Sequence, residues 1–169
     1  MEITVQTTYN QKALAAMTRA LRKTVRQKQS QRSKIAAIVV LVLGLIFAVS
    51  ASEINLNFFL NLLAIVVVAA ALIWQDQISG YVARKRMLPG MTTSTTTFSE
   101  DGYHSVTAVG ESDFTYKNIF AIAEDADYFV LIFSSSHAQI YSKAGISGGD
   151  FQALAKLLRK KTNLTIQQF

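Results

Sequence analysis

Two uninterrupted apolar runs, close together in the chain, constrain its fold more than any other feature. Residues 35–52 (IAAIVVLVLGLIFAVSAS) and 56–74 (LNFFLNLLAIVVVAAALIW) contain no charged residue, and only residues 53–55 separate them. A helix needs about 18 or more apolar residues to cross a hydrocarbon layer ~30 Å thick. A helix at the surface of a soluble core would carry a polar stripe, and neither run has one. The pattern therefore predicts a transmembrane helical hairpin with spans at 35–52 and 56–74.

The charges that flank the two runs predict how the hairpin is oriented. No acidic residue occurs between Glu2 and Glu53, whereas this stretch holds eight basic residues, and more basic residues follow the second run. Basic flanking segments stay on the cytoplasmic side of a membrane, so we expect both termini to be cytoplasmic. Aromatic and basic residues gather where that interface would lie, and we predict interface contacts for Lys34, Trp74, Tyr81, Arg84, Lys85 and Arg86.

Polar and small residues inside the runs suggest how the two spans pack. Asn57 and Asn61 lie four residues apart and so share a helix face. They either hydrogen-bond to the partner helix or lie at the headgroup boundary. Small residues on the first run permit close helix packing and self-association: Ala36, Ala37, Gly44 and Ala48.

The N-terminal segment combines a short strand with a basic helix. Residues 2–8 (EITVQTT) are β-branched and alternate in polarity, which predicts a strand that joins a sheet in the C-terminal part of the chain. Residues 10–34 lack Gly and Pro and favour a helix, with Thr8 or Asn10 as its N-cap. Its apolar stripe lies either on anionic lipid headgroups or on the C-terminal domain, and consists of Leu14, Met17, Leu21 and Val25.

The remaining chain is predicted to form a small domain rich in strands. A helix over 75–87 ends at Pro89-Gly90, which marks the domain boundary. An amphipathic helix over 150–161 follows the strands. Between them we predict antiparallel strands at 91–98, 103–109, 117–123, 127–134 and 137–141, with turns at 99–102, 110–113, 124–127 and 145–149.

The chain thus divides into four segments. We expect a strand and basic amphipathic helix at 1–34, the transmembrane hairpin at 35–74, a juxtamembrane helix and linker at 75–90, and a cytoplasmic β domain at 91–169. The fold class is α+β: a two-helix hairpin plus a small antiparallel sheet, a partly open barrel, closed by the C-terminal helix. The domain is acidic and the segments beside the membrane are basic, which does not favour nucleic-acid binding.

Four segments of the domain carry a family resemblance. They read FSEDG from Phe98, YKNI from Tyr116, EDADYFVL from Glu124 and IYSKAGI from Ile140. Together with the preceding hairpin they resemble the bacterial YcxB-like proteins over residues 97–158. The resemblance implies a two-span bacterial membrane protein with a pleckstrin-homology-like (PH-like) domain, and it carries no active-site residue.

No residue pattern supports catalysis or a cofactor. The chain has no cysteine, and its histidines, His104 and His137, lack ligand spacing for a metal. The acidic group at 124–127 lacks the length of a calcium loop, so we read it as a turn. The serines at 134–136 and the glycines at 145–149 match neither a nucleophile elbow nor a phosphate-binding loop. We therefore expect no catalytic, cofactor or metal residues.

Lys143 is the one basic residue of the domain that we single out. It lies in the IYSKAGI segment, in a domain with few bases. It forms either an ion pair at the strand end or a contact to a protein partner or lipid headgroup.

The sequence favours a binding function over an enzymatic one. We expect a non-enzymatic protein of the bacterial inner or plasma membrane whose cytoplasmic domain binds a protein partner or a second copy of the chain. The alternative is a subunit of a channel or transport complex, although neither run holds an ionisable residue that would line an ion pathway.

Overall fold

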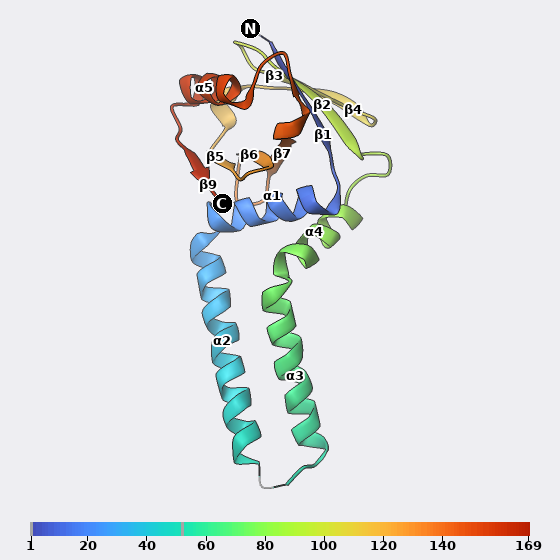
Figure 1. The fold of residues 1–169 in the computed structure, drawn as a ribbon, viewed down its shortest axis with the longest axis vertical. Helices are drawn as coiled ribbons and strands as arrows, with labels where there is room; N and C mark the ends of the chain where they lie inside the picture. The colour runs from blue at the N-terminus through green and yellow to red at the C-terminus, as the bar shows by residue number, and fades with distance from the viewer. Residues whose placement is uncertain (1, 52) are drawn as a thin grey trace.

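The computed structural model describes residues 2–51 and 53–169. It is an elongated molecule in which a helical hairpin extends from a domain of two sheets (Figure 1). The hairpin consists of α2 (Gln27–Ser50) and α3 (Leu56–Ile73), and neither helix contains a buried residue. Both helices are long and apolar enough to cross a membrane. The predicted helical hairpin is confirmed, although Ser52, the last residue of the first predicted span, lies outside the described residues. Its insertion into a membrane stays a prediction.

The first sheet incorporates the N-terminus of the chain. The strand β1 (Ile3–Thr8) pairs antiparallel with β2 on one side and β8 on the other, with Ile3 opposite Phe98. The predicted pairing of the N-terminal strand with the C-terminal domain is therefore confirmed. The strands follow the order β4 (Gly110–Phe114), β3 (Tyr103–Thr107), β2 (Thr93–Phe98), β1, β8 (Ile146–Ser147).

The most apolar strand of the domain is an inner strand of the second sheet. All five residues of β6 (Tyr128–Ile132) are buried, and apolar residues on both faces are typical of a strand covered on both sides. Its edge strand β9 (Ile166–Gln168) runs parallel to β5. The expectation of a purely antiparallel sheet is wrong for this pair, because α5 carries the chain back before β9 begins. The order is β7 (Ala138–Ser142), β6, β5 (Ala121–Glu124), β9.

One predicted turn is a strand. Residues 110–113 belong to β4, which pairs with β3 through a two-residue turn at 108–109. The strand was missed because its polar residues lack the β-branched pattern and its first four residues are exposed. Gly110 has φ +149°, a conformation that favours glycine at the end of the turn.

Two helices close the two apolar layers of the domain. The C-terminal helix α5 (Phe151–Thr162) begins at the N-cap Asp150 and packs Leu154 and Leu158 into the core between the sheets. The helix α1 (Gln11–Lys23) has Asn10 as its N-cap and covers the other face of the second sheet. Its stripe packs on the domain, which decides between the two placements left open by the sequence. Short 3-10 turns occur at η1 (Tyr116–Asn118) and η2 (Lys143–Gly145).

The predicted continuous helix over 10–34 is interrupted. The chain leaves α1 at Thr24, whose hydroxyl donates to the Ala20 carbonyl at 2.7 Å, and α2 starts at Gln27. The interruption lets α1 lie across the upper ends of the hairpin while α2 descends (Figure 1). On the other side α3 continues after Trp74 into α4 (Gln75–Lys85), which packs against α1.

Candidate functional site

The junction between the domain and the hairpin is a close crossing of α1 and α4. Gly80 is the only buried residue of α4. A Cβ atom at this position would come within 2.8 Å of the Ala15 backbone nitrogen and 3.0 Å of its Cα atom. Because backbone atoms cannot move aside as a flexible side chain does, any larger residue at position 80 separates the two helices.

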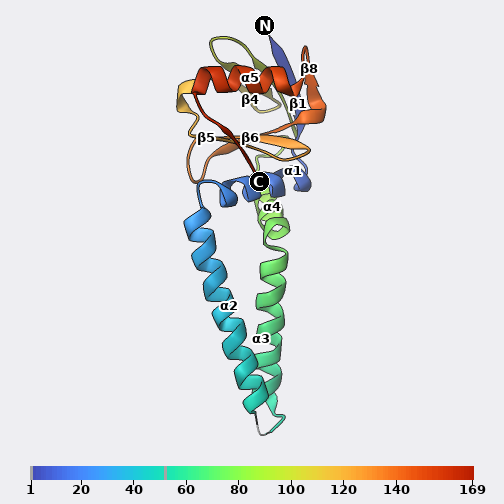
Figure 2. The same ribbon diagram turned by 60° about the vertical axis from the view of Figure 1, so that its left-hand side comes forward.

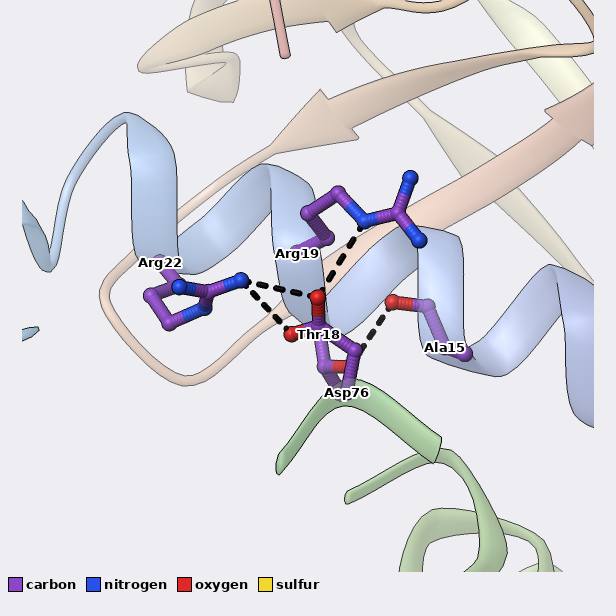
Figure 3. A network of polar contacts seen from close by, with 5 residues as sticks. All are labelled: Ala15, Thr18, Arg19, Arg22 and Asp76. Carbon is purple, nitrogen blue, oxygen red and sulfur yellow. Dashed lines mark hydrogen bonds and ion pairs between the residues drawn. The ribbon is translucent and has the colours of Figure 1, made fainter. Parts of the chain in front are cut away.

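An ion-pair network secures this crossing (Figure 3). Nη2 of Arg22 donates to both carboxylate oxygens of Asp76 at 2.8 Å, and Nε of Arg19 donates to Oδ2 at 3.2 Å. The side chains of Arg22 and Asp76 are only 19% and 17% exposed, so water screens this pair less than a surface pair. Asp76 also lies in the first turn of α4, where the helix dipole favours a negative charge.

Asp76 was not predicted as a functional residue from the sequence. It is the only acidic residue between Glu53 and Glu100, and it lies two positions after an apolar run. This isolated position is the sequence feature that could have indicated a role for Asp76. Its partners lie more than fifty positions earlier in the chain, at sequence separations of 54 and 57, so no local pattern connects them.

A groove lies between β4 of the first sheet and β7 of the second. Its volume is about 460 Å³. Three methionines line it: Met17 from α1, and Met87 and Met91 from the linker after α4. Methionine side chains are flexible and polarizable, which suits a surface that adapts to a partner. The groove also reaches Val109 and Glu111 at the exposed edge of the first sheet.

Lys143 has contacts inside the domain. Its Nζ lies 2.5 Å from Oε2 of Glu124 and 2.6 Å from the Asp125 carbonyl oxygen. It also lies 4.1 Å from the ring centroid of Phe151. The sequence left open whether Lys143 forms an ion pair at the strand end or contacts a partner or headgroup. The structure contains the ion pair. A contact of Lys143 with a partner or headgroup stays a prediction.

The predicted interface residues lie on α2, between α3 and α4, on α4 and directly after it. Trp74 separates α3 from α4 and is 54% exposed, and Tyr81 on α4 is 50% exposed. Nζ of Lys85 lies 5.0 Å from the Tyr81 ring centroid. Lys34, Arg84 and Arg86 are exposed as well. Their contact with a membrane stays a prediction.

Within the hairpin, Asn61 connects the two helices. Its Nδ2 donates to the Gly44 carbonyl oxygen at 2.9 Å, which confirms the interhelical hydrogen bond for this residue. A Cβ atom at Gly44 would come within 2.8 Å of Ile65, so the helices approach closely here. Asn57 lies one turn nearer the loop and lines a cavity there together with Asn61.

The acidic turn and the histidines have structural contacts. Asp125 accepts hydrogen bonds from the backbone nitrogens of Asp127 and Tyr128 at 2.9 and 2.7 Å, which confirms the turn.

Nδ1 of His104 on β3 lies 2.7 Å from Oδ1 of Asp113, and this hydrogen bond raises the pKa of His104 above its usual 6.5. His137 directly follows the three serines at 134–136. Within residues 2–51 and 53–169, no group of three metal-binding side chains comes together.

Comparison with known families identifies the domain. Residues 98–158 match the family model described as YcxB-like protein. These residues form a YcxB-like domain. The match runs from the end of β2 into α5, so β1 and β9 complete the two sheets of the YcxB-like domain from outside the matched range. The resemblance noted from the four sequence segments is confirmed for this part of the chain.

Other comparisons add little to this result. A chain in the structure of the Spt16D Pob3N heterodimer is 16% identical, with a TM-score of 0.32. The match covers 44% of this chain and 45% of that chain, which is less than half of either. No curated protein matches the sequence.

Proposed function

We propose that this chain is a membrane-anchored interaction protein. The hairpin inserts into the inner or plasma membrane of a bacterium, both termini lie in the cytoplasm, and the YcxB-like domain binds a protein there without catalysing a reaction. The observation that carries the proposal is the methionine-lined groove beside the edge strand β4. The crossing of α1 and α4 supports it, because it holds the groove at a fixed position relative to the hairpin.

The edge strand supports an extended protein segment as the partner. In a two-residue hairpin the residues flanking the turn exchange hydrogen bonds, and the paired positions then alternate along the ladder. Thr107 and Gly110 flank the turn, so the backbone groups of Glu111 and Asp113 face away from β3. An exposed strand edge of this kind pairs with an extended segment of another protein.

The charge and the apolar surface at this edge indicate the composition of the partner segment. The side chains of Glu111 and Asp113 are 71% and 87% exposed at this edge. We therefore expect an extended, basic segment whose apolar side chains enter the groove. Its main-chain groups would pair with β4, and its bases would lie near the two carboxylates.

A pair of matched substitutions tests the proposal. Glu111→Pro removes an outward N–H group of β4, whereas Glu111→Gln removes the same charge and keeps that group. The full-length protein is extracted in mild detergent, its mass is measured by light scattering, and a photo-crosslinking residue at Val109 captures what lies in the groove. A crosslinker at the exposed Gln152 of α5 serves as the control position.

We expect one defined crosslinked species, either another protein or a second copy, at Val109 and none at Gln152. Glu111→Pro should abolish it, and Glu111→Gln should only weaken it. Equal crosslinking in the Pro variant would contradict the edge-strand mode. Ion flux through reconstituted protein would contradict the interaction function and favour the channel alternative.

A further inference from the structure

A polar cavity lies under α1, between the first turns of α2 and α4. Its volume is about 290 Å³, and every residue that lines it is polar. α2 begins here without a side-chain cap and with no acidic residue in its first turn. Its lining residues include Arg22, Arg26, Ser30, Ser33, Gln75 and Ser79.

The charges in this cavity are unequal. Asp76 is the one acidic residue lining it, and Arg22 and Arg19 already neutralise that carboxylate. Arg26 adds a further positive charge, and its Nε donates to the Ser135 carbonyl oxygen, which anchors the side chain. The Nε–H group of Arg22 is buried and has no acceptor among the described residues. The cavity therefore has an excess of positive charge and of donors, which suits an anionic oxygen ligand.

The cavity is at the level where the apolar part of the hairpin begins. Ser33 precedes the first apolar run by two positions, and Gln75 follows Trp74 directly. Figure 2 shows α2 and α3 approaching each other toward the loop and diverging toward α1. Below the cavity the helices expose large apolar side chains, including Ile38 (54% exposed) and Ile73 (70% exposed). A molecule with a phosphate head and apolar tails matches both surfaces at once.

We infer that this cavity binds the phosphate of an anionic phospholipid headgroup. Arg22 and Arg26 hold the phosphate oxygens, and the serine and glutamine side chains bind the polar part of the headgroup. The acyl chains lie along the apolar surfaces of α2 and α3. The inference goes beyond the proposed function, because it needs no protein partner and no particular use of the groove.

Lipid titration of the full-length protein tests the inference. The purified protein, in a neutral detergent, is titrated with dihexanoyl phosphatidylglycerol, with dihexanoyl phosphatidylcholine and with inorganic phosphate. The midpoint of thermal unfolding and the number of bound lipids by native mass spectrometry are recorded. Arg26→Gln removes a cavity charge, and Arg32→Gln removes a matched charge from an exposed residue of α2 that does not line the cavity.

We expect one phosphatidylglycerol per chain, with a higher unfolding temperature and weaker effects from the other two ligands. Arg26→Gln should weaken this binding roughly tenfold, as loss of a hydrogen bond to a charged group does. Arg32→Gln should change it by less than about twofold. Equal sensitivity of the two variants would overturn the inference, since the lipid would then respond to overall charge. Binding of inorganic phosphate alone would overturn it as a lipid site.

Discussion

At the scale of single residues, Asp76 decides how firmly the domain is attached to the hairpin. Its carboxylate is the shared acceptor for two arginines of α1. Asp76→Asn should lower the free energy of unfolding by about 1–3 kcal/mol, because Arg22 then remains mostly buried without its counter-ion. Thermal unfolding of the full-length protein in detergent measures this change. Asp101→Asn, at an exposed turn position, is the control and should have little effect.

His104 provides a prediction about pH. Its hydrogen bond to Asp113, with smaller electrostatic contributions from Asp113 and Glu111, raises its pKa in the folded protein. The protonated form is favoured by folding, so the stabilisation is complete below the unfolded pKa of about 6.5 and is lost as pH rises through the folded pKa. NMR titration of the His104 ring should give a pKa above 6.5. In Asp113→Asn the value should fall; an unchanged pKa would contradict the assigned cause.

At the scale of secondary-structure elements, β1 determines whether the domain can exist alone. It lies between β2 and β8, and its buried residues Ile3 and Val5 belong to the core. Gly145 is required for this packing, because a Cβ atom there would overlap the Gln6 carbonyl oxygen. The two-sheet domain is therefore built from both ends of the chain, and the YcxB-like region at residues 98–158 is one part of it.

The fragment 91–169 should consequently fail to fold. It lacks β1, which leaves a gap inside the first sheet, and it lacks α1, which exposes the apolar face of the second sheet. Backbone amide NMR spectra should show a disordered chain. Linking residues 2–24 to the fragment through a flexible spacer should restore dispersed signals. A folded fragment 91–169 would show that β1 is dispensable.

At the scale of the whole molecule, the hairpin separates a basic end beside the domain from a loop with one acid. The proposed insertion therefore predicts opposite accessibility of the loop and the domain. The chain has no cysteine, so single substitutions report directly. In intact cells a membrane-impermeant maleimide should label Glu53→Cys. It should label Ser136→Cys, in the loop before β7, only after permeabilisation. The reverse pattern would contradict the cytoplasmic placement of the domain.

The sequence by itself determined the elements that depend on local patterns. The hairpin follows from two long apolar runs, α5 from its cap and apolar stripe, and the buried strand β6 from apolar residues on both faces. These features need only neighbouring residues, because helix and strand periodicity and capping act over a few positions.

The tertiary structure alone decided which distant segments meet. It placed α1 on the second sheet, interrupted the helix at Thr24, joined β9 to β5 in parallel, and brought Asp76 to Arg22. The polar strand β4 also exists only because β3 supplies its hydrogen bonds. Each of these depends on contacts between residues far apart in the chain, whose energy repays the cost of loop closure only after the whole domain has formed.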